Sequence, residues 1–198
     1  MACTDVDLYD SVLHCAGAKI LPGVREKAYY IKKSNIVTWP TLPAITAATI
    51  FATLASYTGN FTLASDKTWH RIDLTPAQTS NVQCTSQGEA PSKSFNNVAS
   101  LVVPGTEEEV SALARLLNND DVVVLVPQRN GKYRVIGNSA YHTNVTVTQT
   151  TGAASTDAAT TTLEVSCTDE CPAPFYPGNI VADDGTISGA DDSPAGKL

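Results

Sequence analysis

Apolar residues in the middle of the chain follow the spacing of strands and of one helix. Residues 94–103 end in an apolar run and residues 122–126 are apolar throughout, and a proline follows each, so we expect two buried strands. Between them, apolar residues recur with the spacing i, i+3, i+4 and i+7 at Val110, Leu113, Ala114 and Leu117. The pattern predicts an amphipathic helix over residues 106–117 that packs against a sheet.

The start of this helix has the residues of a capping box. Thr106 is followed three residues later by Glu109, and side chains at that spacing can accept bonds from each other's backbone N–H groups. Glu107 and Glu108 fall in the first turn, where the helix dipole favours negative charge. We therefore interpret the three glutamates as part of the helix start and not as a carboxylate site.

A hairpin is expected after the helix. Asn130-Gly131 predicts a two-residue type I′ turn, because both central positions of that turn need a positive φ. The turn would join the strand over residues 122–126 to a second strand over residues 132–136.

Two further strands are expected near the C-terminus. Residues 143–149 and 160–166 alternate hydroxyl-bearing and apolar side chains, which predicts a long strand pair joined by the small-residue loop 150–159. Such a strand can pack one face on a core while its other face lines water. The alternation suits a polar lumen or a smooth interface, and equally an ordinary solvent-facing sheet.

The remaining segments give weaker patterns. Alternation over residues 60–63 and 68–74, with 65–67 as the turn, predicts a hairpin. Residues 75–92 are mostly polar with glycine and proline, and we expect a long loop, a kind of segment that is often functional. Residues 171–178 hold three prolines and predict a non-helical exit across a sheet edge.

The expected organisation is an N-terminal arm with a proline-containing excursion over residues 1–58, a β-sandwich or β-barrel domain over residues 59–178, and a flexible acidic tail over residues 179–198. Within the arm, residues 27–31 are extended and apolar, and the two prolines of residues 39–43 exclude a central strand. Propensity leaves residues 44–57 undecided between helix and strand.

Composition supports a mainly β fold and excludes some functions. Only 17% of the residues are charged, while Thr, Ala, Ser and Val are abundant, as in sheet proteins. The formal charge of −7 argues against a protein that wraps nucleic acid, because such binding needs Lys and Arg to neutralise phosphates. The first residues lack a signal-peptide pattern, and no apolar run is long enough to span a membrane, so we expect cytoplasmic synthesis and no membrane insertion.

We find no pattern of residues that predicts catalysis. The three histidines stand alone, and no nucleophile-elbow, phosphate-loop or dinucleotide motif occurs. The five cysteines are odd in number, and we read them as reduced thiols, although Cys167 and Cys171 have the spacing of a loop clip or a metal half-site. His14 beside Cys15 does not predict a thiol–base pair, since adjacent strand residues face opposite ways. We therefore expect no enzyme, no catalytic residues, no cofactor and no metal.

The order of these elements resembles the tail tube proteins of tailed bacteriophages. The resemblance covers roughly residues 61–176 and rests on the helix at 106–117, the hairpin at 122–136, the threonine-rich strands and the polar loop at 75–92. In that family, a β-sandwich or barrel carries one flanking helix, and six subunits pool long hairpins into a ring whose inner wall is a continuous β-barrel.

The resemblance implies a virion structural protein. Rings of this family stack into a tube through which DNA passes as transient cargo, and loops and the N-terminal arm reach the next ring. The implied partners are copies of the chain itself and other tail or connector proteins, and the implied location is the virion, assembled in the host cytoplasm. The proline-rich segment 39–43 and the aspartate-rich tail depart from the pattern and suit a decoration or head–tail connector protein as well.

A binding module is the alternative from a different class. In that case, the loops 75–92 and 150–159 would contact a glycan or protein, with aromatic stacking surfaces at Trp39, Trp69, Tyr133 and Tyr141. An enzyme is the least favoured reading, because no titratable residues converge in the pattern.

Overall fold

The computed structural model describes residues 8–14, 16–17, 20–46, 48, 50–76 and 79–190. The elements, in chain order, are β1 (Lys27–Lys32), η1 (Lys33–Asn35), β2 (Ile36–Thr38), η2 (Phe51–Ala55), β3 (Thr62–Leu63), β4 (His70–Asp73), β5 (Asn81–Gln87), β6 (Ser94–Pro104), α1 (Glu108–Leu117), β7 (Val122–Pro127), β8 (Tyr133–Ile136), β9 (Asn144–Thr150), β10 (Thr160–Asp169), β11 (Phe175–Tyr176), β12 (Asn179–Ala182) and β13 (Gly185–Ser188). The predicted class, mainly β with one flanking helix and long hairpins, is confirmed.

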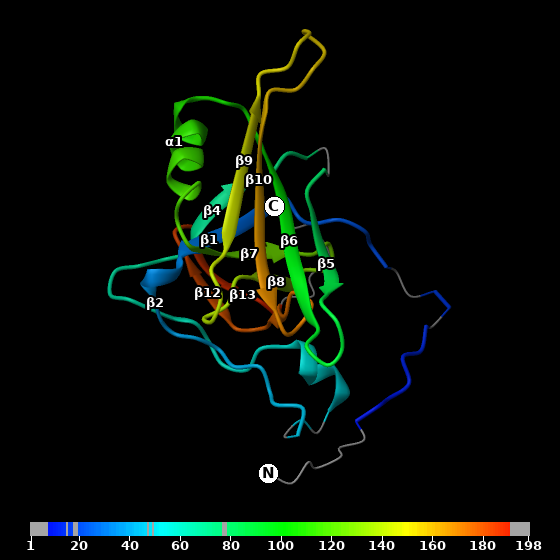
Figure 1. The fold of residues 1–198 in the computed structure, drawn as a ribbon. Helices are drawn as coiled ribbons and strands as arrows, with labels where there is room; N and C mark the ends of the chain where they lie inside the picture. Colours follow the sequence, from blue (N-terminus) through cyan, green and yellow to red (C-terminus); the bar gives the residue numbers. More distant parts are fainter. Residues whose placement is uncertain are drawn as a thin grey trace.

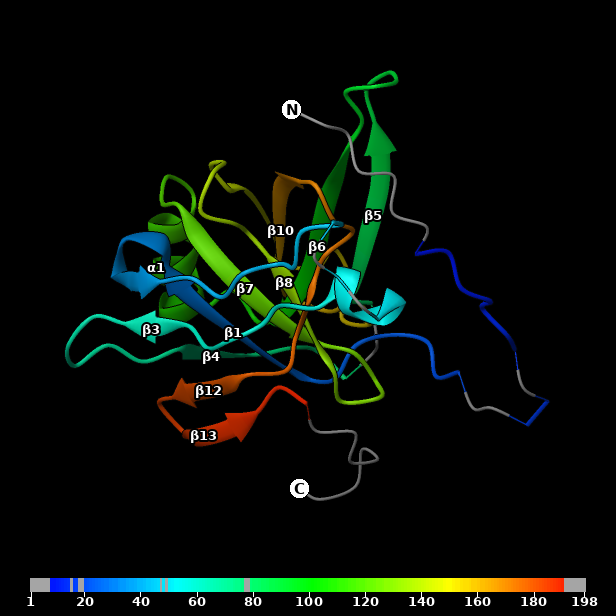
Figure 2. The ribbon, with the colours of Figure 1, turned by 90° about the horizontal axis from the view of Figure 1, so that it is seen from below.

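Most strands belong to two sheets that pack face to face. The first sheet has the order β5-β6-β10-β9 and the second has the order β11-β8-β7-β1-β4. The strands of the two sheets cross, and the long β9–β10 hairpin extends past the second sheet on the side of α1 (Figure 1). Figure 2 shows β12 and β13 on the side of the second sheet that faces away from β5 and β6.

Strand β7 shows how the second sheet contributes to two apolar clusters, one on each of its faces. All six of its residues are buried, because alternate side chains enter the apolar clusters on the two faces of the second sheet. The cluster between the two sheets takes in Ala99, Leu101, Val122, Val124, Val126, Leu163 and Val165. The cluster on the outer face of the second sheet takes in Tyr29, Phe61, Trp69, Val123, Leu125, Tyr176 and Ile180.

The strands with strong apolar patterns lie where the sequence predicts them. Strands β6 and β7 occupy the expected apolar runs, and β7 pairs with β8. Strands β9 and β10 pair as expected, from Asn144 opposite Ser166 to Thr150 opposite Thr160, with β9 one residue later in the chain than the predicted strand. The proline-containing exit also pairs at a sheet edge, where β11 lies against β8.

The start of α1 differs from the predicted capping box. The N-cap residue is Glu107, without a capping hydrogen bond from its side chain, so Glu109 stands one position too early to reach back to the cap. The first turn is closed instead by Ser111, whose Oγ donates to the carbonyl of Thr106 at 2.9 Å. Of the two glutamates predicted for the first turn, Glu108 lies there, together with Glu109, whereas Glu107 is the N-cap residue.

The Asn130-Gly131 turn is also of a different type. Gly131 has a φ of 95°, whereas Asn130 does not have a positive φ, which excludes type I′. The backbone N–H of Gly131 donates to Gln128, and that of Gln128 donates to Lys132, both at 2.9 Å. These bonds define a three-residue loop in which glycine takes the left-handed position.

The predicted hairpin over residues 60–74 does not form. Strand β3 pairs with β2, and β4 pairs with β1, so the two segments lie in different layers. Each segment pairs with another strand instead, and they meet through side chains, since Phe61 lies edge-on against Trp69 with ring centroids 5.3 Å apart in the cluster on the outer face of the second sheet.

Residues 75–92 are not one long loop. Residues 81–87 form β5, which pairs along its whole length with β6. Backbone bonds to a well-specified neighbour therefore order a segment that has little apolar content of its own.

Two segments assigned to the arm and the tail belong to the folded body. Strand β1, within the expected arm 1–58, lies between β4 and β7 because its apolar side chains enter both cores. Residues 179–188, within the expected tail 179–198, form the β12–β13 hairpin, which buries Ile180 and Ala182. Residues 191–198 lie outside the described residues.

Candidate functional site

One face of the first sheet is not covered by any other helix or strand among the described residues (Figure 1). The register places every second residue of its four strands on this face, and none of them is buried. They are Asn81, Gln83, Thr85 and Gln87 of β5; Ser94, Asn96, Val98, Ser100, Val102 and Pro104 of β6; Thr160, Thr162, Glu164, Ser166 and Thr168 of β10; and Asn144, Thr146, Thr148 and Thr150 of β9. We call this surface the outer face.

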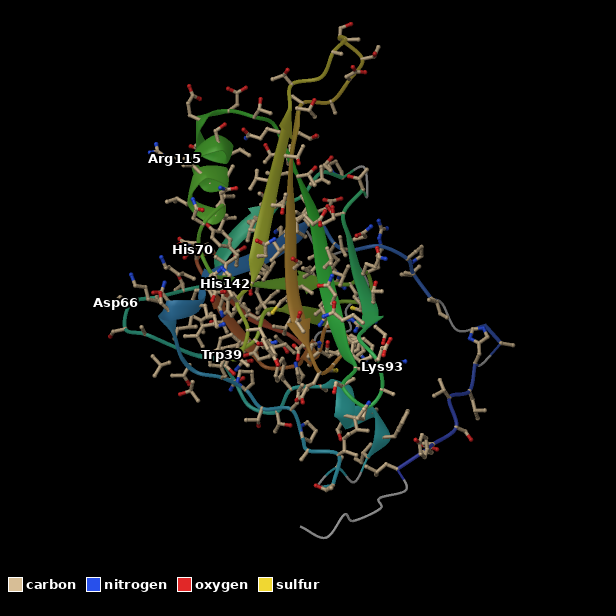
Figure 3. All side chains as sticks on the ribbon, in the orientation of Figure 1. Trp39, Asp66, His70, Lys93, Arg115 and His142 are labelled. Carbon is tan, nitrogen blue, oxygen red and sulfur yellow. The ribbon has the colours of Figure 1, made fainter. Side chains whose placement is uncertain are left out.

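The outer face is polar but almost without charge. Glu164 is its only ionisable side chain, and hydroxyl and amide groups form most of the rest. Nearby cations stand at its margins, because Lys93 lies in the β5–β6 connection and Arg115 on α1 (Figure 3). A DNA backbone near this surface would find hydrogen-bonding groups but no cation to neutralise its phosphates.

The residues between those of the outer face point the other way and anchor the first sheet to the core. Val145 of β9, Val165 of β10 and Ala99 of β6 point inward in one row and are buried between the sheets. The threonine–valine alternation therefore separates a water-facing side from a packed side.

The two edges of the first sheet are open. Strands β5 and β9 lie at its ends, and neither has a ladder partner or bridge on its outer side among the described residues. The second sheet differs, because Trp69 next to β4 bridges Ala182, and Phe175 of β11 bridges Ser56. A single bridge thus lies at or beside each edge strand of the second sheet, whereas the edge strands of the first sheet have none among the described residues.

Neither open edge has the residues that usually prevent edge-to-edge pairing. Strand β5 reads NVQCTSQ and β9 reads NVTVTQT, so both lack lysine, other charged residues and proline. Natural monomers commonly protect exposed edges with such residues. Sequence reasoning found the β9 edge but missed the β5 edge, where the alternation of Val82 and Cys84 with polar residues was the available signal.

Helix α1 lies on the inward side of the β9 edge. The side chain of Gln149 donates to Ser111 Oγ of the helix at 3.3 Å and to Thr161 Oγ1 at 3.0 Å. Thr161 in turn donates to the carbonyl of Gly105 at 3.0 Å, just before the helix. This network fixes the acidic start of α1 beside the open edge.

The thiols are not placed for chemistry. Burial raises the pKa of Cys84 and Cys167, and it raises the pKa of Cys171 to about 11, so all three stay protonated near neutral pH. All three are free, and Cys3 and Cys15 lie outside the described residues. In the part of the chain that the structure describes, no group of three or more His, Cys, Asp or Glu side chains could hold a metal ion.

Two histidines have structural partners. His70 Nδ1 lies 2.7 Å from Asp183 Oδ2, and Thr68 also donates to Asp183, which ties β4 to the loop of the β12–β13 hairpin. His142 Nδ1 lies 3.1 Å from Asp121 Oδ2. Of the aspartates weighed for calcium, Asp183 and Asp184 serve this hairpin, while Asp191 and Asp192 lie outside the described residues.

The four aromatic residues considered for ligand stacking do not form a common exposed surface. Trp69 and Tyr133 are buried in the second core, and Trp39 packs edge-on against Phe61 with ring centroids 5.4 Å apart. Tyr141 is exposed but stands in a different loop, between β8 and β9. The structure therefore offers no aromatic platform at these positions.

No protein family model, curated protein or solved structure matches this chain. Among the described residues, none of the helices has the length and apolar character needed to cross a membrane.

Proposed function

We propose that this chain is a virion structural protein, a tail tube subunit that assembles into stacked, hexameric rings around a channel for DNA. The observation that supports the proposal is the first sheet, which combines an uncovered, nearly uncharged outer face with two open edges free of charged residues and proline. Such a sheet is incomplete in one copy and complete when copies pair.

The strand directions allow head-to-tail pairing. The four strands alternate in direction, so β9 of one copy and β5 of the next would be antiparallel, like every neighbouring pair within the sheet. Because β5 and β9 are different surfaces, each copy keeps one edge free for the next until the ring closes. Closure removes all edges from the sheet.

The outer face then becomes the inner wall of the ring. A wall of hydroxyl and amide groups with one carboxylate per copy would let DNA pass without holding it, because affinity for the backbone comes from cations. The net charge of −7 also disfavours binding to the negatively charged DNA backbone.

Negative-stain electron microscopy and analytical ultracentrifugation of the purified chain test the proposal. We expect rings or tubes with a central channel, in a concentration-dependent equilibrium with the monomer. A monomer that persists at every concentration contradicts the proposal. Rings that never stack would instead place the chain with head–tail connector proteins.

A further inference from the structure

The two open edges match each other residue by residue. Strands β5 and β9 are both seven residues long, and in both the first, third, fifth and seventh residues lie on the outer face. Antiparallel pairing over the full length sets Asn144 opposite Gln87 and Thr150 opposite Asn81. Every outer-face residue then meets another outer-face residue, so the alternation of faces continues across the junction.

This pairing shifts each copy along the strand direction. Within one copy, the ladders align Asn144 with Ser166, Ser166 with Val98, and Val98 with Gln83. Across the junction, Asn144 would align with Gln87, four residues further along β5. Each copy of four strands therefore adds a stagger of four residues, about 13 Å at the rise of a strand.

A stagger of this size is compatible with a closed barrel. The stagger equals the number of strands for any number of copies, as in eight-stranded barrels with a shear of eight, whose strands tilt by about 36°. With an unshifted junction, Asn144 would lie opposite Gln83 and the strands would not tilt against the barrel axis. Most residues of β5 and β9 would then have no partner in the neighbouring copy.

The same pairing brings α1 of one copy to a cavity of the next. Gln149, which holds Ser111 of α1, would lie opposite Val82, and Val82 lines a cavity of about 370 Å³ together with Ile20 and Leu21. Ile20 and Leu21 are exposed in the single chain. Figure 1 and Figure 2 both show α1 and β5 on opposite sides of the molecule, as a head-to-tail contact requires.

The charges at this contact are complementary. The start of α1 has three exposed glutamates, the N-cap residue Glu107 and the first-turn residues Glu108 and Glu109. Arg129 stands between the lining residues Gln128 and Asn130 in the β7–β8 turn, and Arg25, which follows the lining residue Val24, donates from Nε to the carbonyl of Arg129 at 3.4 Å. Opposite charges on the two surfaces favour this orientation over contacts between identical surfaces.

We propose that β9 of one copy pairs with β5 of the next in this staggered register, with Thr148 opposite Gln83, so that the acidic start of α1 covers the cavity beside Val82. The proposal rests on the proposed function, and it specifies the partner surface and the register of the ring.

Engineered disulfides distinguish the registers. The variant with Gln83→Cys and Thr148→Cys places two cysteines opposite each other in the staggered register, within the Cα separation that a disulfide spans. The matched control, with Gln83→Cys and Asn144→Cys, does so only in the unshifted register. Within one copy, β5 and β9 lie about 14 Å apart across the sheet, so neither pair can close internally.

After mild oxidation, we expect the first variant to give a ladder of cross-linked oligomers on a non-reducing gel. The control variant, the single substitutions and the unmodified chain should give none. Rings in micrographs without this ladder, or with a ladder from the control, would overturn the register and leave the proposed function standing. Absence of rings from all proteins would overturn the proposed function, and a ladder without rings would support the register alone.

Discussion

Removal of the Tyr176 hydroxyl should destabilise the fold by a measurable amount. Tyr176 is fully buried, and its hydroxyl accepts from the backbone N–H of Phe61 at 3.1 Å and donates to the carbonyl of Asn179 at 2.9 Å. In Tyr176→Phe, both backbone groups lose their partner, while the ring and its packing remain.

The loss of stability in Tyr176→Phe comes mainly from the backbone N–H of Phe61, which is left without an acceptor. Phe61 is itself buried, so its N–H has no access to water, and a buried donor without a partner costs about 1–3 kcal/mol. Asn179 is exposed, and its carbonyl can turn to solvent at little cost. We expect a loss of about 2 kcal/mol in the free energy of unfolding, which lowers Tm by about 4–8 °C in a chain of this length.

Urea denaturation followed by tryptophan fluorescence measures this loss. Both tryptophans pack edge-on against Phe61, so their emission reports on the same cluster. Tyr29→Phe is the matched control, because Tyr29 is equally buried but its hydroxyl makes only a long contact of 3.5 Å to Asp184, and we expect a change of about 0.5 kcal/mol or less. Equal stability of the two variants would refute the reasoning.

Three further changes test the outer face, the lateral contact and the C-terminal hairpin. Glu164→Lys should leave rings intact but make them retain DNA at low salt in a mobility-shift assay, whereas Glu164→Gln should not. Glu108→Arg should lower the fraction of rings in sedimentation, and the added change Arg129→Glu should restore it. The hydrogen bond from Thr68 lowers the pKa of Asp183, so Asp183 stabilises the fold above the ordinary carboxyl pKa near 3.8, and this contribution is lost as pH falls through the lower folded pKa. Asp183→Asn should therefore be less stable than the unmodified chain at pH 7 in urea denaturation, and the gap should close as pH falls through the lowered folded pKa of Asp183.

The sequence predicts elements whose signal is local and misses those whose partner is distant. The spacing of Val110, Leu113 and Leu117 is sufficient for α1, and the unbroken apolar run is sufficient for β7. The β12–β13 hairpin is short, with four residues in each strand, and a backbone bridge joins Trp69 to Ala182, more than a hundred residues apart, which no local pattern contains.

The two edges of the candidate site also differ in whether their signal is local in the sequence. The β9 edge is predictable, because valine and threonine alternate over residues 145–148. Strand β5 has only Val82 and Cys84 among polar residues, and its order comes from pairing with β6. Half of the proposed interface therefore follows from periodicity, and the other half from the fold.

The strongest argument for assembly is the difference between the edge strands of the two sheets, because both sheets belong to one chain. The same polypeptide that bridges Trp69 to Ala182 and Phe175 to Ser56 leaves the outer sides of β5 and β9, each seven residues long, without a ladder partner or bridge among the described residues. An edge of that length without charge or proline invites pairing with any strand that meets it. Since the two edges are antiparallel to each other and share one alternation, the best-matched strand for each is the opposite edge of another copy.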